Sequence, residues 1–190
     1  LDLGEFLGRY HADFATWEND VFTVSEKEGV LHLDVPGQMD FALNPPDEEG
    51  KWAFALTDTI KISFDRDDDE NVTNINMFQG PMMFELPREG VERVPEIPLD
   101  DLEPYLGTYR NEGQVWSIVI HGDRLAVDVP SEMVYELHPP DEDRKWKFRA
   151  TDSMAISLDM GEDGRAEHLH AYKNGEVVLE LERAPDSEEM

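Results

Sequence analysis

One short stretch decides the fold because it occurs twice: Asn44–Trp52 reads NPPDEEGKW and His138–Trp146 reads HPPDEDRKW. Such a pair is a doubled active-site loop, a doubled ligand site, or a turn that the fold needs twice. Proline has a fixed φ and no N–H donor, which suits the end of a strand and the start of a turn. The acids keep the turn in water, and the tryptophan begins the next buried strand. We therefore interpret each stretch as a hairpin turn.

The matching extends well beyond the two turns. Two further pairs share their spacing of 94 residues: LHLDVP (Leu31–Pro36) with LAVDVP (Leu125–Pro130), and KWAFALTDTIKISFD (Lys51–Asp65) with KWKFRATDSMAISLD (Lys145–Asp159). FLGRY (Phe6–Tyr10) matches YLGTY (Tyr105–Tyr109) at a spacing of 99, so the first copy carries five extra residues before LHLDVP. An internal repeat of this length predicts two copies of one structural unit. We predict domains at residues 1–90 and 102–190, joined by a proline-rich, acidic linker at 91–101.

Within each copy the apolar residues recur with a period of two, which is typical of half-buried β-strands. Trp116, Ile118 and Ile120, for example, alternate with Ser117, Val119 and His121, and short turns such as HGD and KNG separate these runs. We predict an all-β protein made of two tandem antiparallel meander β-barrels with about eight short strands each, since closure removes exposed strand edges. The alternative is one larger barrel or sandwich built from both copies.

Composition excludes several classes of function. A formal net charge of -28 opposes binding to nucleic acid or anionic lipid, and reflects either adaptation to high salt or simple acidity. No apolar run is long enough for a membrane span. The chain has no cysteine, so disulfides, thiol catalysis and cysteine–zinc sites are excluded. It begins at Leu1, which indicates processing or a domain boundary; an extracytoplasmic bacterial location is favoured.

The second copy resembles a known family in a loose pattern of turn and core residues. The matching positions are Tyr105–Tyr109, Gly122–Leu125, Pro130, Pro139, Asn174–Glu176 and Arg183. The first copy matches less well, through Leu7, Gly8, Tyr10, Pro36 and Pro45. The family is the small lipocalin-like β-barrel domain appended C-terminally to bacterial serine hydrolases of the beta-lactamase and D-aminopeptidase type. The resemblance implies an accessory domain that shapes substrate access or assembly, with a serine hydrolase catalytic domain as its partner and no catalytic residue of its own.

The sequence contains no recognised catalytic motif. None of its serines begins a Ser-x-x-Lys motif, and there is no Gly-x-Ser-x-Gly elbow and no His-Glu-x-x-His pair. Adjacent carboxylates recur in both turns, Asp47 with Glu48 and Asp141 with Glu142. Glycosidase chemistry needs one carboxyl whose pKa is raised by an apolar environment, whereas carboxylates in a proline turn are usually solvated. We predict a non-enzymatic protein without cofactor, and retain an acid-residue hydrolase as an alternative.

Two stretches contain possible metal ligands. His168 and His170 lie on one face of a predicted strand, as two ligands of one metal ion would, and Asn74 and Asn76 occupy the matching positions of the first copy. The alternative is a pair of polar residues on the solvated face. Asp65, Asp67, Asp69 and Asn71 alternate as in the start of a calcium loop, but Glu70 stands where the turn needs glycine and Asn76 where a glutamate is needed, so this stretch is better explained as a hairpin turn.

A small barrel of eight strands is either filled by its own side chains or holds one small ligand. The candidate ligand-lining residues are the large aromatics of the predicted strands: Trp52, Phe54, Trp116, Tyr135, Trp146 and Phe148. The other interpretation is that these side chains fill the interior. The sequence thus leaves two main hypotheses, an accessory module of a hydrolase and a free-standing binder of a small apolar or aromatic ligand.

Overall fold

The computed structural model describes residues 1–186 and confirms the all-β prediction. Two compact units divide between Glu92 and Arg93, and each is described here by itself. Residues 187–190, the end of the predicted second domain, lie outside the described residues. In the part that is described, no helix has the length and apolar character needed to cross a membrane.

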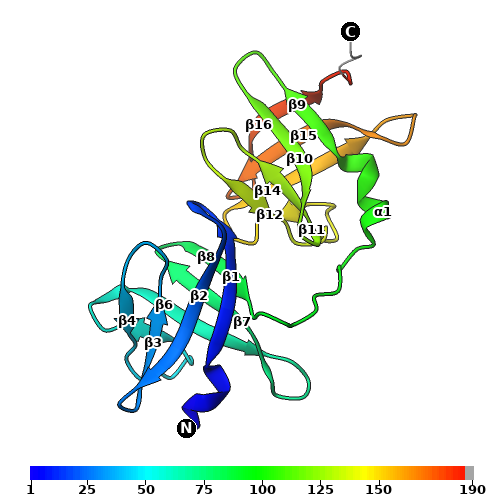
Figure 1. Cartoon of the computed structure of the whole chain (residues 1–190). Coiled ribbons are helices and arrows are strands. Elements are labelled where there is room, and N and C mark those ends of the chain that lie inside the picture. Colours follow the sequence, from blue (N-terminus) through cyan, green and yellow to red (C-terminus); the bar gives the residue numbers. More distant parts are fainter. Residues whose placement is uncertain (187–190) are drawn as a thin grey trace. The chain divides into compact units, whose positions relative to one another are not determined.

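The first unit contains a short 3-10 helix and eight strands (Figure 1). These are η1 (Leu3–Phe6), β1 (Gly8–Phe14), β2 (Trp17–Lys27), β3 (Val30–Asp34), β4 (Asp40–Ala42), β5 (Trp52–Phe54), β6 (Thr57–Arg66), β7 (Val72–Gln79) and β8 (Met82–Pro87). They form two antiparallel four-stranded sheets in sequential order, β1 to β4 and β5 to β8. Isolated bridges join the sheets at both ends, Leu43 with Phe54 and Tyr10 with Arg88.

The PPDE stretch of this unit is a turn, as predicted, and lies between β4 and β5. Its shape comes from Asp47, whose carboxylate accepts the backbone N–H groups of Glu49 (3.0 Å) and Lys51 (2.9 Å). In the second copy the carboxylate of Asp141 likewise accepts the backbone N–H groups of Asp143 (2.9 Å) and Lys145 (3.0 Å). An aspartate that satisfies backbone donors two residues ahead is a standard turn device. The acidic residue of the motif is therefore structural in both copies.

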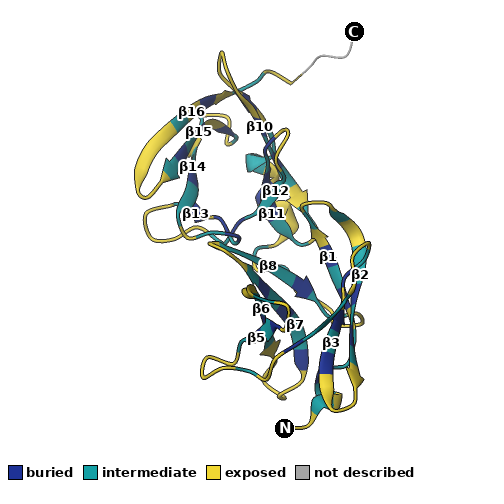
Figure 2. Cartoon of the chain, turned by 90° about the vertical axis from the view of Figure 1, so that its left-hand side faces the viewer, coloured by how far each residue is buried: buried dark blue, intermediate teal, exposed yellow. Residues whose placement is uncertain are grey.

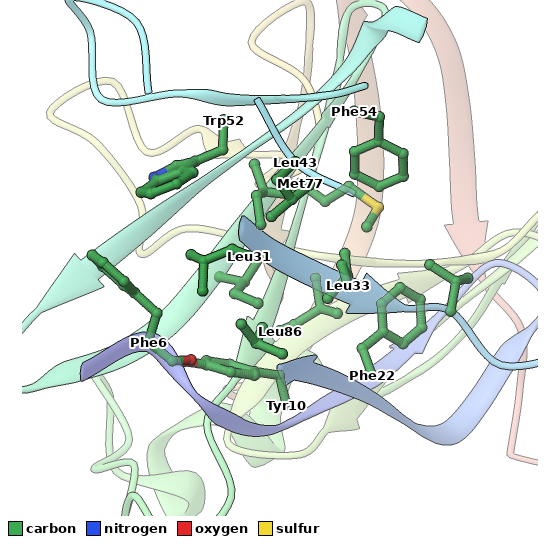
Figure 3. Packing of buried hydrophobic residues seen from close by; sticks show 14 of the residues in the cluster. Phe6, Tyr10, Phe22, Leu31, Leu33, Leu43, Trp52, Phe54, Met77 and Leu86 are labelled. Atoms are coloured by element: carbon green, nitrogen blue, oxygen red, sulfur yellow. The ribbon is translucent and has the colours of Figure 1, made fainter. Parts of the chain in front are cut away.

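The interior of the first unit is filled by side chains from both sheets. Figure 3 shows Leu31, Leu33 and Leu86 between aromatic rings, with Phe6 and Trp52 on one side and Phe22 and Phe54 on the other. The Phe6 and Trp52 rings meet edge to face, with centroids 5.6 Å apart. The predicted period of two thus turns the larger apolar residues inward.

The second unit contains two short helical segments and eight strands. These are α1 (Leu99–Leu102), η2 (Glu103–Tyr105), β9 (Gly107–Arg110), β10 (Val115–His121), β11 (Arg124–Asp128), β12 (Val134–Glu136), β13 (Trp146–Lys147), β14 (Met154–Met160), β15 (Ala166–Lys173) and β16 (Glu176–Arg183). All eight strands belong to one antiparallel sheet in the order β12-β11-β10-β9-β16-β15-β14-β13. An isolated bridge between Leu137 and Phe148 connects the segments at the two ends of this order.

Residues 93–101, which the sequence predicts as a linker, contact the second unit. Ile97 packs against its core, and the guanidinium of Arg93 lies 3.3 Å from the Asp123 carboxylate. Pro98 precedes α1, whose Leu102 is buried in the same core. Burial of Ile97 and Leu102 holds this segment against the second unit.

An arginine near the end of each unit binds the segment where that unit begins. Arg183 donates from Nη1 to the Leu106 carbonyl (2.7 Å) and from Nη2 to the Pro104 carbonyl (3.1 Å) and the Tyr109 hydroxyl (2.9 Å). It also donates from Nε to the Ala166 carbonyl. Arg88 does the equivalent in the first unit, donating to the carbonyls of Glu5 (3.1 Å), Val72 (3.1 Å) and Leu7 (2.6 Å).

The five extra residues of the first copy lengthen its first hairpin and cover its last strand. Phe14 of β1 stacks on Phe84 of β8, with ring centroids 4.4 Å apart. In the second unit β9 pairs with β16 only at Arg110–Glu182 and Tyr109–Arg183. The start of β16 is consequently exposed, as Figure 2 shows in yellow, and Val177 and Val178 are 50% and 56% exposed. The matching residues of the first unit, Met82 and Met83 at the start of β8, are half-buried.

The arginine contacts make a matched pair of glycine substitutions informative. Gly107 has a φ of 149°, and a Cβ there would lie 2.3 Å from Nη1 of Arg183. Gly8 has nearly the same φ, 147°, but its Cβ would lie 3.4 Å from Arg88. We expect Gly107→Ala to lower the free energy of unfolding of its unit by about 2 kcal/mol more than Gly8→Ala does, because only Gly107→Ala displaces a charged hydrogen-bond donor. Hydrogen exchange resolved by peptide, measured at increasing urea concentration, reports each unit separately; equal losses in the two variants would contradict the role given to Arg183.

Candidate functional site

The six aromatic residues predicted to line a ligand site lie mostly in the two cores. Five are buried, being between 3% and 8% exposed: Trp52, Phe54, Trp116, Trp146 and Phe148. Tyr135 is half-buried, contacts Phe148 with ring centroids 5.2 Å apart, and donates from its hydroxyl to Glu132 (2.9 Å). A hollow beside Leu102, Leu125 and Trp146 measures about 10 Å³, which is room for about one water molecule. These rings pack against their neighbours.

A much larger hollow, a cleft of about 710 Å³, lies on the second unit. Five segments line it: η2, the PPDE turn, β13, β14 and β15. The lining residues are Tyr105, Pro140, Asp141, Asp143, Arg144, Trp146, Ser157, Leu158, Asp159, Met160 and Tyr172. We name it the β14 cleft. Of the aromatics predicted for a ligand site, Trp146 is the one that reaches it.

The matching region of the first unit is filled by two side chains of β6. Phe64 packs against both Phe6 and Trp52, with ring centroids 4.5 Å and 6.3 Å away. Arg66 extends over the Phe6 ring at 5.5 Å and donates two hydrogen bonds to Glu5, at 3.0 Å and 2.6 Å. Phe64 and Arg66 therefore close over the 3-10 helix of that unit.

Shorter or uncharged residues replace them in the second unit. Leu158 stands at the position of Phe64, and Met160, which is 48% exposed, stands at that of Arg66. Tyr105 and Trp146 keep the edge-to-face contact of Phe6 and Trp52, with centroids 5.2 Å apart. Because the pair is retained and its cover is lost, the cleft opens beside it.

The charges in the β14 cleft are mainly negative. Asp159 lies 3.3 Å from Nδ1 of His170 on the adjacent strand, whereas the matching Asp65 accepts the amides of Asn74 (3.1 Å) and Asn76 (2.8 Å). Asp141 holds its own turn, and the backbone N–H of Lys145 that it accepts keeps the pKa of its carboxyl below the usual value. Three aspartates thus face one arginine among the lining residues.

Two cationic side chains border the cleft in different ways. The ammonium of Lys145 lies 4.4 Å from the centroid of the Tyr172 ring, and the Tyr172 hydroxyl is 3.0 Å from Ser157 Oγ. Arg144 has a φ of 60°, where the first copy has Gly50 at 75°. A left-handed conformation costs a non-glycine residue about 1–2 kcal/mol. The second copy therefore carries a long cationic side chain at a position where glycine is unstrained.

His168 and His170 point to the same side of β15, but their surroundings do not form a metal site. His168 is exposed, and the second nitrogen of His170, Nε2, lies 3.6 Å from Glu180. Leu169 and Ala171, which alternate with the two histidines, are fully buried. Among residues 1–186, no group of three or more His, Asp or Glu side chains is arranged to hold a metal ion.

The stretch that resembles the start of a calcium loop folds as a turn. The carboxylate of Asp67 accepts the backbone N–H groups of Asp69 (3.0 Å) and Asn71 (2.9 Å). The Asn71 bond is the main reason that the pKa of Asp67 lies below its usual value. Glu70 adopts a φ of 64° without being glycine. The carboxylate oxygens expected as ligands thus bind the chain itself, and Asp65 binds Asn74 and Asn76.

The two recurring aspartates of the PPDE turns, Asp47 and Asp141, do not have the chemistry of a general acid. The backbone N–H of Lys51 lowers the pKa of the Asp47 carboxyl, and that of Lys145 does the same for Asp141. A glycosidase-type acid requires a pKa raised by an apolar environment. Both aspartates are held in their ionised form instead.

A charged cluster that sequence patterns did not indicate lies on β10, β11 and β12. Glu136 places Oε1 3.0 Å from Nδ1 of His121 and accepts a hydrogen bond from Arg124 at 2.8 Å. Burial raises the pKa of Glu136, but His121 and Arg124 outweigh it, so the pKa lies below its usual value. His32, Asp40 and Lys27 form a similar group on β2, β3 and β4, in which Lys27 stands at the position of His121 and the other two residues at non-matching positions. Only strand pairing brings these residues together, so spacing in the sequence carried no signal.

This cluster predicts a specific pH dependence. Because the pKa of Glu136 is lower when folded than when unfolded, its contribution to stability is complete above the unfolded pKa and is lost as the pH falls through the folded value. We expect Glu136→Gln to lower the free energy of unfolding by about 1–3 kcal/mol at pH 7, and the difference from the unmodified chain to shrink below about pH 4. Urea denaturation at both pH values measures this; a difference that does not change with pH would show that charge is not what Glu136 contributes.

Comparison with known proteins adds no identification. No protein-family model matches the chain, and no curated protein shows significant sequence similarity to it.

Proposed function

We propose that this chain is a non-catalytic tandem of two lipocalin-like barrels that serves as an accessory module of a serine hydrolase. The closed form of each barrel is part of the proposal. Its support is the sequential antiparallel order of eight strands per unit, together with the isolated bridges at Leu43–Phe54, Tyr10–Arg88 and Leu137–Phe148. The match between the two copies supports a duplicated origin.

The observation that carries an accessory role is the exposed apolar segment of β16. Val177 and Val178 are about half exposed, on a strand whose first half lacks a neighbour on the β9 side. Exposed apolar groups beside an unpaired strand edge are a site for docking another protein. The filled interiors agree with a module that acts through its outer surface, and the Asp carboxyls held ionised in the PPDE turns do not favour acid catalysis.

The hydrolase partner leads to a prediction about a longer polypeptide. We expect the reading frame upstream of the Leu1 codon to encode a Ser-x-x-Lys catalytic domain. In that protein, Val177→Asp combined with Val178→Asp should lower kcat/KM by about tenfold or more, the equivalent of about 1.4 kcal/mol of lost docking energy. Leu56→Asp, at a residue that is 71% exposed on the first unit, is the control and should leave kcat/KM unchanged.

The same experiment has outcomes that contradict the accessory role. A signal peptide directly upstream of Leu1, with no catalytic domain, supports a free-standing binder instead. Hydrolysis of nitrophenyl esters by the isolated chain, above a heat-denatured control, would show that the chain is itself an enzyme.

The second candidate function is binding of a small apolar or aromatic ligand, and the β14 cleft is the observation that favours it. The interiors are packed, so we place the ligand on the surface cleft rather than among Trp52, Phe54, Trp116 and Phe148. We expect long-chain fatty acids, which require an open lumen, to leave tryptophan emission and Tm unchanged. A saturable shift in either quantity would show that an interior opens.

A further inference from the structure

We propose that the β14 cleft binds a small organic cation with an apolar or aromatic body. The inference rests on the second candidate function and names the chemical class of its ligand. It draws on three independent features: the loss of two filling side chains, the sign of the charge around the opening, and the aromatic faces that line it.

The first feature is the comparison of the two units, which acts as an internal control. In the first unit Phe64 and Arg66 occupy the region over Phe6 and Trp52. In the second unit Leu158 and Met160 leave the equivalent pair, Tyr105 and Trp146, beside a cleft of about 710 Å³. A volume in this range is typical of small-molecule sites. The apolar body of the ligand would lie against Trp146, Leu158 and Met160.

The second feature is charge. Asp141, Asp143 and Asp159 line the cleft with Arg144, and the ammonium of Lys145 borders it over Tyr172, so that three carboxylates face two cations. Arg66, the cation at the closed site of the first unit, is engaged by Glu5, and its replacement by Met160 removes that positive charge from the second unit. The balance around the cleft therefore favours a cation over a neutral or anionic molecule of the same shape.

The third feature is the aromatic lining. The Tyr172 ring already faces the ammonium of Lys145, at 4.4 Å from the ring centroid. The first unit shows the same preference at Phe78, with Lys51 at 4.7 Å. Aromatic faces attract cations, and the attraction grows as water is excluded. A ligand ammonium that replaces Lys145 over the Tyr172 ring would combine this attraction with that of the Asp159 carboxylate.

The test uses three molecules of one shape and different charge. The full chain is titrated with 2-phenylethylammonium, with 2-phenylethanol as the neutral analogue and with phenylacetate as the anionic one. The readout is the indole N–H resonance of each tryptophan, observed by 1H–15N NMR. We expect 2-phenylethylammonium to shift the Trp146 resonance saturably, with an affinity about tenfold above that of the alcohol, and to leave the matching Trp52 unchanged.

Two variants exchange features between the units. Leu158→Phe combined with Met160→Arg installs the filling residues of the first unit and should weaken binding by about tenfold or more, while the backbone amide spectrum shows that the fold is kept. Arg144→Gly installs the residue of the first copy, removes the opposing charge, and should strengthen binding several-fold. If Arg144→Gly weakens binding of 2-phenylethylammonium, the assignment of a cationic ligand is wrong.

The outcomes separate this inference from the function on which it rests. If phenylacetate or 2-phenylethanol shifts Trp146 at least as strongly as the ammonium does, the cleft is a ligand site but its ligand is not a cation. If none of the three molecules shifts Trp146, or if Trp52 responds equally, both the cation and the cleft as a ligand site are overturned.

Discussion

Each unit depends on one arginine that ties its last strand to its first turn. A 3-10 helix leaves carbonyl groups without partners at its end, and these need donors when the segment is packed against a core. Arg183 and Arg88 supply several donors from one planar group, which a lysine ammonium cannot match in geometry. Both side chains are half-buried, and the bonds offset the cost of removing part of each guanidinium from water. In each unit these bonds join two segments that are about 80 residues apart in the sequence.

The strands could be predicted because their signal is local. Alternation placed Trp116, Ile118 and Ile120 on one face of a strand. Trp116 and Ile118 are buried, whereas Ile120, near the end of β10, is exposed. The division of the first unit into two sheets could not be predicted in this way. The contact at the proline turn is a single bridge in both units, Leu43–Phe54 and Leu137–Phe148. The units differ at the other closure, where β9 and β16 pair at two positions but β1 and β8 meet only in the bridge Tyr10–Arg88. No periodicity encodes whether so short a contact becomes a ladder.

The candidate site was less predictable than the fold, for a related reason. Large aromatics on strands indicate burial, and burial alone does not separate a filled interior from a lined cavity, so Trp116 and Phe148 were ambiguous. The change from Phe64 to Leu158 was visible in the matched sequences. The structural effect of this change could not be predicted, because Phe64 covers Phe6, which is far away in the sequence. Equally, His170 attracted attention as a metal ligand, whereas its observed neighbours are Asp159 and Glu180.

The two units share one strand pattern but differ in whether the aromatic pair beside the first helix is covered. In the first unit Phe64 and Arg66 cover the pair Phe6–Trp52. The second unit keeps the equivalent pair, Tyr105–Trp146, without this cover. In the proposed function, the residues that line the β14 cleft determine which ligand the second unit binds. The net charge of -28 does not do this by itself, because charges beyond about 8 Å are screened at physiological ionic strength. Selectivity has to come from groups within that distance of a ligand. In the β14 cleft these are three aspartates, one strained arginine, the ammonium of Lys145 at the border and three aromatic rings.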